Sequence, residues 1–243
     1  MKNLVIDIGN SYAKAGLFAS GRLAQTYHYL SAETVLKMIR EKEFDALLVS
    51  SVAAESSEIR EIVELHQHYI LLNSSTPLPF RNHYHTPKTL GTDRIAAVAG
   101  AISLFPEQAV LAIDAGTCIT YDIADGQGNY YGGSISPGLQ MRGKAMHTFT
   151  ARLPLVSIAQ KEMEEAPLVG YSTHTALQSG ILYGTLAEIT QMIRMYADKF
   201  GDLKVVICGG DAPLLIKGIP IAHTFAPELI LIGLNRILEH NVS

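Results

Sequence analysis

The sequence lacks the features that mark secreted, membrane-spanning or nucleic-acid-binding proteins. It contains only two cysteines, Cys118 and Cys208, whose spacing suits neither a metal site nor a disulfide framework. No apolar stretch approaches the roughly 18 residues of a membrane span, and the N-terminus carries no long apolar segment of the secretory type. The net charge is −4, and no cluster of five or more Lys or Arg residues occurs. We therefore expect a cytoplasmic protein that binds neither nucleic acid nor a membrane.

The sequence does contain one short motif twice, each time at the end of an apolar strand pattern. The copies are Asp7-Ile8-Gly9-Asn10-Ser11 and Asp114-Ala115-Gly116-Thr117-Cys118. The Asp suits a cation, the Gly lets backbone N–H groups approach an oxyanion, and the hydroxyl adds a donor. One copy alone is typical of ordinary turns. Two copies, each followed by a strand rather than a helix, exclude the dinucleotide-binding fingerprint and predict a duplicated domain that handles phosphate.

The order of predicted elements also repeats in the two halves of the chain. In the first half, periodicity predicts strands at 3–7, 13–18 and 23–29, a helix capped by Ser31, a strand at 46–49, a helix at 58–67 and a strand at 69–72. In the second half it predicts strands that start near residues 109, 119 and 130, then helices at 139–147, 175–200 and 227–240, with a strand at 204–208. The repeat predicts two domains, 1–108 and 109–243.

Two further motifs lie outside this repeat. Before the second half, Tyr84 precedes Gly91-Thr92-Asp93-Arg94, which opens a helix of small residues that runs to Leu104. After the strand at 204–208, Gly209-Gly210-Asp211-Ala212 offers bare backbone. That backbone suits a nucleobase or ribose, and it equally suits close packing of a strand against a helix.

A duplicated three-strand unit with Asp-x-Gly loops resembles the superfold of actin, sugar kinases and Hsp70-like ATPases. Within that superfold, the ordered motifs resemble those of the type III pantothenate kinases over nearly the whole chain. The resemblance implies α/β architecture with two ribonuclease H-like (actin-like) domains, each a mixed sheet flanked by helices, and a cleft between them. The matching residues are Asp7-Ile8-Gly9-Asn10-Ser11 with Lys14, Tyr84 with Pro87, Gly91 to Arg94, Asp114 to Thr117 with Thr120, Gly133 to Leu139, Ala151-Arg152-Leu153-Pro154, Thr173, Ala176 to Gly180, and Gly209 to Ala212.

The same resemblance implies an activity and its cofactors. The family phosphorylates pantothenate with ATP to give 4′-phosphopantothenate, the first step of coenzyme A biosynthesis. It uses Mg2+ and a monovalent cation, K+ or NH4+, and it generally forms homodimers in which the partner completes the substrate site.

By this resemblance, the ATP and cation site draws on both motifs. Asp114 matches the ligand of the monovalent cation. Asp7 is assigned to Mg2+, because that ion prefers oxygen ligands and keeps several waters. The residues expected to surround ATP and its phosphates are Asp7, Ile8, Gly9, Asn10, Ser11, Tyr12, Ala13, Lys14 and Thr117.

The acceptor site is expected around Asp93. The match puts this carboxylate at the acceptor hydroxyl as the general base, whereas an isolated Asp here would complement a helix dipole. Arg94 suits the substrate carboxylate, although a surface salt bridge is the usual role of an Arg. Outside the family pattern, Tyr84 would be an ordinary loop aromatic and Thr173 a helix cap. The residues expected to contact substrate are Tyr84, Gly91, Thr92, Asp93, Arg94 and Thr173.

Other signals point to structure rather than to chemistry. The segment 138–145 nearly spells a P-loop, but Ala145 replaces the hydroxyl that would bind magnesium, so we expect a helix start there. Alternate histidines at 66 and 68 and at 83 and 85 lack the cysteines of zinc sites. Ser172 stands where the family commonly has Asn, which weakens the expected support for Thr173.

Two other functions remain open from the sequence. A non-catalytic, nucleotide-regulated binding protein or transcription accessory of the same fold would bind ATP without turnover. A kinase of the same superfold would act on a sugar, acetate or another small alcohol. Neither the catalytic Asp nor a phosphate loop is missing, which favours the pantothenate kinase.

Overall fold

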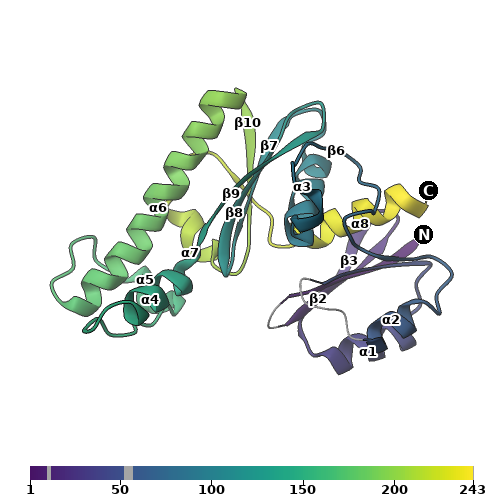
Figure 1. The fold of residues 1–243 in the computed structure, drawn as a ribbon, viewed down its shortest axis with the longest axis horizontal. Coiled ribbons are helices and arrows are strands. Elements are labelled where there is room, and N and C mark those ends of the chain that lie inside the picture. Colours follow the sequence, from purple (N-terminus) through teal and green to yellow (C-terminus); the bar gives the residue numbers. More distant parts are fainter. Residues whose placement is uncertain (10–11, 52–56, 243) are drawn as a thin grey trace. The chain divides into compact units, whose positions relative to one another are not determined.

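Two compact units make up the computed structural model, which describes residues 1–9, 12–51 and 57–242 (Figure 1). By contacts, the first unit comprises Met1–Glu107, Gly126–Tyr131 and Glu228–Ser243, and the second comprises Gln108–Asp125 and Gly132–Pro227. None of the helices in the described part of the chain is both long and apolar enough to cross a bilayer.

The first unit is built on a five-stranded sheet of order β3-β2-β1-β4-β5. Strands β1 and β2 and strands β2 and β3 pair antiparallel, while β4 and β5 continue the sheet in parallel with β1. The strands are β1 (Lys2–Ile8), β2 (Ala13–Ala19), β3 (Arg22–Leu30), β4 (Ala46–Ser51) and β5 (Tyr69–Leu71), and the helices are α1 (Ala32–Glu41), α2 (Ser57–Val63), α3 (Thr92–Leu104), α8 (Leu229–Val242) and the short η1 (Pro87–Thr89).

Side chains of β1 alternate between two helical layers. Leu4 and Ile6 join the apolar core that α1 and α2 cover. Asn3 faces α8 instead, where its amide donates a 2.8 Å hydrogen bond to Asn235. Asp7 has the same parity as Asn3, so it points to the face of the sheet on which α3 and α8 pack.

The second unit repeats the strand order of the first. Its sheet has the order β11-β10-β7-β8-β9-β6, with β7 and β8 antiparallel and β10 and β11 parallel to β7. Read from β9 to β11, this is the order of β3 to β5 in the first sheet, which confirms the predicted duplicated α/β fold. The elements are β7 (Ala109–Ala115), β8 (Cys118–Ala124), β9 (Asn129–Pro137), β10 (Leu203–Cys208), β11 (Thr224–Phe225), α4 (Leu139–Thr148), α5 (Gln160–Glu164), α6 (Thr173–Phe200), α7 (Ala212–Leu215) and η2 (Ile216–Gly218). The short strand β6 (Arg81–Asn82) pairs with the start of β9, and both of these segments group with the first unit by contacts.

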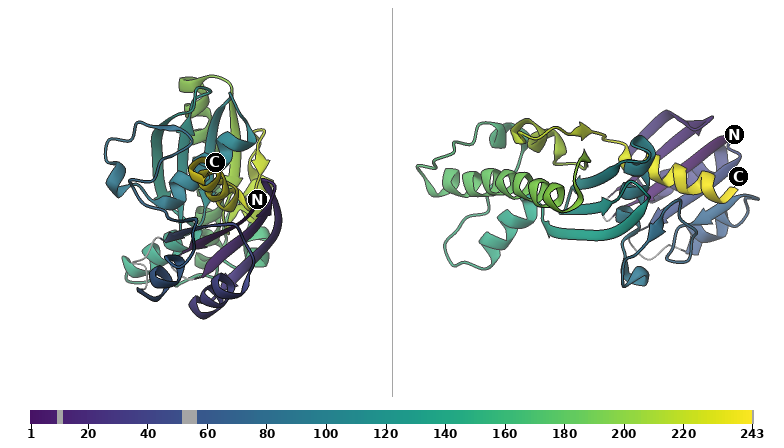
Figure 2. Two further views of the ribbon diagram at one scale, coloured as in Figure 1. Left: turned by 90° about the vertical axis from the view of Figure 1, so that its right-hand side faces the viewer. Right: turned by 90° about the horizontal axis from the view of Figure 1, so that it is seen from above.

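The long helix α6 covers one face of the second sheet (Figures 1 and 2). Ile113 of β7 and Tyr121 of β8, both fully buried, point to this face and share a core with Ile189 of α6. Asp114 has the opposite parity to Ile113, so it lies on the other face of the sheet.

Several element ends differ from the sequence prediction. Helix α2 ends at Val63 instead of 67. The N–H groups of Leu65 and His66 donate hydrogen bonds to carbonyls three residues earlier, which is the pattern of a 3₁₀ turn and ends the α-helix. Helix α6 starts at Thr173, since Ser172 and Thr175 form a reciprocal capping box. The two-residue strands β6 and β11 carry too little periodicity to be predicted.

The last helix groups by contact with the first unit rather than with the second. Helix α8 lies beside α3 and against β1 (Figure 2). The predicted division at residues 108 and 109 describes the duplicated halves of the sequence and stays a prediction.

Glycines let α3 and α8 approach closely. A Cβ at Gly233 of α8 would lie 1.8 Å from the backbone oxygen of Ala96, and one at Gly100 of α3 would lie 2.4 Å from that of Leu229. Both neighbours are backbone atoms, which cannot rotate away. Close packing of α8 therefore holds α3, the helix whose first turn contains Asp93.

We expect Gly233→Ala to destabilise the protein by about 1–3 kcal/mol, because the added methyl group forces the two helices apart. The urea midpoint of unfolding measures this loss. Gly184→Ala in α6 is the matched control: no atom lies within 4 Å of its added Cβ, so it should be neutral or stabilise by up to about 1 kcal/mol. Equal midpoints for Gly233→Ala and the wild type would contradict the observed packing.

Candidate active site

Asp7 lies near the end of β1 between two polar neighbours. Lys14 is its partner across the antiparallel pair with β2, and Ser50 is its partner in β4. Ser50 is fully buried and donates a 3.0 Å hydrogen bond to the hydroxyl of Thr92, the first residue of α3. The sheet register therefore brings Asp7 to the start of α3.

The carboxylate of Asp7 is electrostatically strained. Its Oδ1 atom is buried and has no hydrogen-bond partner among the described residues. Burial, together with the negative charge of Asp93, raises its pKa to about 6, although the positive charge of Lys14 and the nearby hydroxyl group of Ser50 oppose the rise. A cation beside Asp7 would give the Oδ1 atom a partner and would lower the raised pKa.

The N-terminus of α3 positions Asp93. Gly91 is the N-cap residue, and a Cβ there would lie 2.3 Å from Oδ1 of Asp93. This same Oδ1 accepts a 2.8 Å hydrogen bond from the backbone N–H of Arg94. Gly91 thus leaves the space in which the Asp93 carboxylate folds back over the first turn.

Arg94 is a buried residue rather than a surface cation. Only 6% of it is exposed, and its guanidinium carbon lies 5.4 Å from the ring centroid of Tyr84. That ring stacks on Tyr130 at 6.3 Å, and the backbone N–H of Tyr84 donates to Asn82. This burial does not fit the alternative role of Arg94 in a surface salt bridge, and Tyr84 belongs to an ordered aromatic cluster.

The first phosphate loop is described only in part. Gly9 donates its backbone N–H to the carbonyl of Tyr12 at 3.2 Å. Tyr12 is 60% exposed and meets Tyr29 edge to face. The predicted phosphate contacts Asn10 and Ser11 lie outside the described residues.

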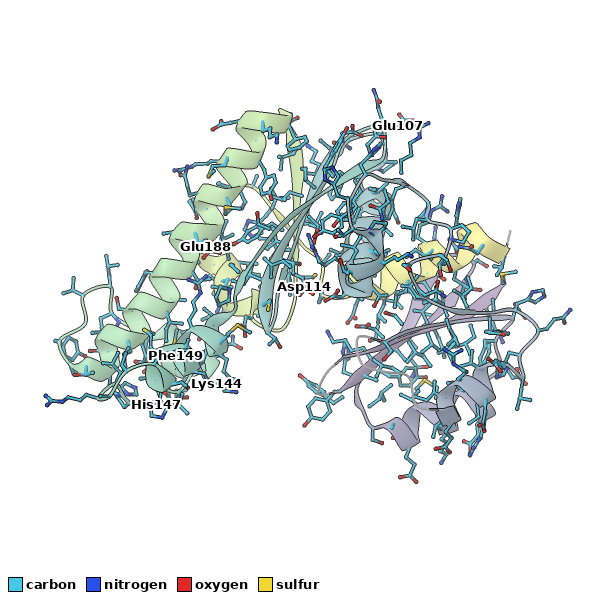
Figure 3. All side chains as sticks on the ribbon, in the orientation of Figure 1. Glu107, Asp114, Lys144, His147, Phe149 and Glu188 are labelled. Carbon is cyan, nitrogen blue, oxygen red and sulfur yellow. The ribbon has the colours of Figure 1, made fainter. Side chains whose placement is uncertain are left out.

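The second phosphate loop follows β7, where Asp114 lies (Figure 3). The N–H of Gly116 donates to the carbonyl of Cys118 at 3.0 Å, and Thr117 is exposed at the tip of this turn. Gly209 has a φ of +100°, and a Cβ there would lie 2.4 Å from Oδ1 of Asp114. A side chain at Gly209 would therefore collide with the carboxylate of Asp114.

Two residues of the second unit were not predicted as part of the site. Asp211 donates its backbone N–H to the carbonyl of Ala115 at 2.9 Å, and burial raises the pKa of its carboxyl group despite a hydrogen bond from the Leu139 backbone. Glu188 lies on α6, the helix that covers the face of the second sheet opposite to Asp114 (Figure 3). The glycine pair before Asp211 was a usable signal, whereas nothing in the local sequence distinguishes Glu188 from other helical glutamates.

Thr173 is exposed in the first turn of α6. The N-cap residue of that helix is Ser172, so Thr173 does not have the capping role that it was given as an alternative. Its free hydroxyl remains at a helix N-terminus, a position that favours polar and anionic ligands.

The P-loop-like segment has a structural role. Residues 138–145 begin α4, with Gly138 as the N-cap residue, as predicted. No group of three or more His, Cys, Asp or Glu side chains arranged to hold a metal occurs in the described ranges. The acidic pair of Asp7 and Asp93 nevertheless fits an ion that takes one or two carboxylates and completes its shell with water and phosphate oxygens, as Mg2+ does.

Comparison with known proteins identifies the family. The family model of type III pantothenate kinases matches residues 3–195. A type III pantothenate kinase of Cytophaga hutchinsonii is 41% identical over 242 residues, which cover 99% of this chain and 100% of the relative.

Solved structures support the fold. A conserved putative Baf family transcriptional activator of Campylobacter jejuni matches with a TM-score of 0.62 at 23% identity, over 98% of both chains. A ROK family glucokinase of Streptomyces griseus matches with a TM-score of 0.57 at 13% identity, over 99% of this chain and all of the other. The architecture is the actin-like ATPase fold. The chain therefore belongs to the type III pantothenate kinases, which phosphorylate pantothenate with ATP in the first step of coenzyme A biosynthesis.

Proposed function

We propose that Asp93 is the general base of this kinase and that the first-unit residues around it bind the acceptor. The observation that carries the proposal is the position of Asp93 at the N-terminus of α3, close enough to Asp7 for the two negative charges to interact. Phosphoryl transfer needs an acceptor hydroxyl held in line with the γ-phosphate and a group that accepts its proton. Asp93 accepts that proton, while the helix N-terminus favours its charge.

The acceptor itself is held by residues that flank Asp93. The buried guanidinium of Arg94 offers a planar pair of donors for the carboxylate of pantothenate. Tyr84 contributes its hydroxyl, and its ring lies beneath the guanidinium. Gly91 and Thr92 add backbone N–H groups. For Thr173, which belongs to the second unit, we assign a substrate contact through its hydroxyl.

The two phosphate loops have different roles in binding ATP and its cations. A divalent metal accompanies ATP in kinases, and we assign Mg2+ to Asp7, where it would offset the charge of the phosphate oxygens. Gly9 and Lys14, with Asn10, Ser11 and the other residues predicted for this loop, contact those oxygens. In the second loop we assign the monovalent cation, K+ or NH4+, to Asp114 and an ATP contact to Thr117.

We also propose that the enzyme works as a homodimer in the cytoplasm, where ATP is available. The segment between α4 and α6 supports a second copy as partner, because it exposes large apolar side chains that a monomer would leave in water. These side chains are Phe149 (Figure 3), Leu155, Leu168, Val169 and Tyr171.

A coupled assay tests the function directly. With ATP and Mg2+, the purified protein should release ADP only when pantothenate is present, and K+ should raise the rate. Glucose, acetate and glycerol serve as alternative acceptors. Release of ADP with one of these and not with pantothenate would contradict the assigned substrate, and binding of both ligands without product would indicate a non-catalytic protein.

A further inference from the structure

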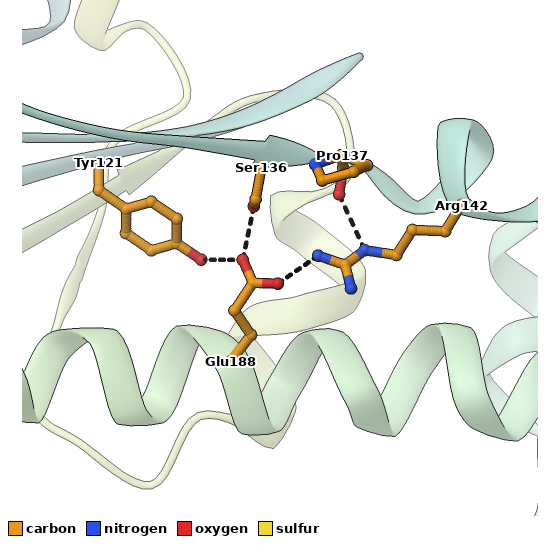
Figure 4. Close-up of polar contacts among 5 residues, drawn as sticks. All are labelled: Tyr121, Ser136, Pro137, Arg142 and Glu188. Atoms are coloured by element: carbon orange, nitrogen blue, oxygen red, sulfur yellow. Dashed lines mark hydrogen bonds and ion pairs between the residues drawn. The ribbon is translucent and has the colours of Figure 1, made fainter. Parts of the chain in front are cut away.

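The carboxylate of Glu188 joins three structural elements to α6 (Figure 4). Its Oε1 atom accepts hydrogen bonds from the hydroxyl of Tyr121 in β8 at 2.9 Å and from that of Ser136 in β9 at 2.5 Å. Its Oε2 atom accepts one from the guanidinium of Arg142 in α4. All four side chains belong to the second unit.

The cluster keeps Glu188 ionised. Burial alone would raise the pKa of its carboxyl group, but the hydrogen bonds from Ser136, Arg142 and Tyr121 outweigh burial and hold the pKa below its usual value. Burial, together with the negative charge of Glu188, raises the pKa of Tyr121, so the phenol stays a donor. An ionised carboxylate, which only accepts, therefore serves three donors at once.

Arg142 connects the Glu188 cluster to the segment that contacts the second phosphate loop. Its Nε atom donates a 2.9 Å hydrogen bond to the carbonyl of Pro137. The next residue, Gly138, donates its N–H to the carbonyl of Thr117 at 3.1 Å. A Cβ at Gly138 would lie 2.1 Å from the carbonyl oxygen of Gly116, so the backbone of this turn packs directly against the loop.

The segment after β10 contacts the other side of the same loop. The backbone N–H of Leu139, which follows Gly138, bonds to the carboxylate of Asp211. Asp211 in turn donates its own N–H to the carbonyl of Ala115. The loop is thus held between the start of α4 and the segment after β10, and Glu188 anchors the α4 side.

We propose that Glu188 is a positioning residue for the second phosphate loop. Through Arg142 and the Pro137 carbonyl, it sets the place of the Gly138 turn and hence of Thr117 and Asp114. This inference rests on the proposed assignment of that loop to ATP and the monovalent cation. The acceptor contact Thr173 lies 15 residues earlier on α6, about 22 Å along the helix axis, so the effect should concern ATP and the cation and not pantothenate.

Two variants separate positioning from simple stability. Glu188→Gln keeps the size of the side chain but lacks the charge that pairs with Arg142. Arg142→Lys keeps a cation for Glu188 but lacks the planar fork that also reaches the Pro137 carbonyl. We expect each to raise both the KM for ATP and the K+ concentration for half-maximal activation by about tenfold, which corresponds to about 1.4 kcal/mol, because each variant weakens one charge-assisted hydrogen bond of the cluster. The KM for pantothenate should stay within twofold.

Glu164→Gln is the matched control. Glu164 also forms an ion pair in the second unit, at 2.6 Å from Lys217, but no contact connects this pair to the Gly138 turn in the described structure. Its ATP and K+ constants should equal those of the wild type. Asp114→Asn, measured in parallel, reports on the loop assignment itself.

The outcomes are distinct. If Glu188→Gln lowers only the melting temperature and leaves both constants within twofold of the wild type, while Asp114→Asn raises them, the positioning role is wrong and the loop assignment stands. If neither variant changes either constant, the loop assignment is wrong and the positioning role with it. A rise in the pantothenate KM equal to that in the ATP KM would also overturn the positioning role.

Discussion

Asp93→Asn should lower kcat by about 10²- to 10⁴-fold, the usual contribution of a general base. The amide cannot accept the proton of the acceptor hydroxyl, but its oxygen can still accept the bond from the Arg94 backbone. The binding of ATP and of pantothenate should therefore persist. Steady-state kinetics measure the loss, and calorimetric titration with each ligand measures the retained binding.

Asp198→Asn provides the control for this experiment, because Asp198 is an exposed residue of α6. It should match the wild type in both measurements. If Asp93→Asn retained a kcat within tenfold of the wild type, Asp93 would act only at the helix N-terminus, as an isolated acidic residue does there.

Asp7→Asn should abolish most activity and yet stabilise the metal-free protein. In the folded state the pKa of Asp7 rises from 3.8 to about 6, so folding favours its protonated form. The resulting cost to stability is absent below about pH 4, grows as the pH rises toward 6, and is constant above that. With about 1.4 kcal/mol for each pKa unit, the amide should raise the free energy of unfolding by up to about 3 kcal/mol at pH 8 and by about half of that at pH 5.

Urea unfolding in the presence of a chelator measures this gain at the two pH values, and Mg2+ titration of the rate measures the functional loss. We expect kcat/KM to fall by at least about 10²-fold, as when a preorganised electrostatic contact is removed. Asp45→Asn, at an exposed Asp of the same unit, should change neither property. A destabilised Asp7→Asn variant would show that the carboxylate is satisfied without a cation.

Much of the fold could be predicted from local patterns. Alternating and continuous apolar runs marked β1, β2, β7 and β8, and the repeated order of elements predicted the duplicated sheet that the structure contains. Element ends were less accurate, because they depend on caps and last-turn bonds such as the Ser172 capping box. The contact of α8 with the first unit could not be predicted from spacing, since it depends on Gly100 and Gly233 meeting across two helices.

Some residues of the candidate site could likewise be predicted from the sequence, and others could not. The motifs identified Asp7, Asp93 and Asp114 as candidates, because short spacings in a single loop or helix start are visible along the chain. Ser50 was not predicted, since only the parallel register of β1 and β4 puts it beside Asp7. Arg94 was assigned its candidate role by its motif, but its burial beside Tyr84 follows from packing alone.

The sequence by itself determined the duplicated α/β fold, the family and the two candidate phosphate loops, because these depend on local periodicity and on short motifs. The tertiary structure alone decided that the charge of Asp93 acts on Asp7 and that Glu188 anchors the turn behind the second loop. The physical reason is that both arrangements join residues from different strands and helices. Sheet register and helix packing bring such residues together, and no local pattern in the chain encodes their distance.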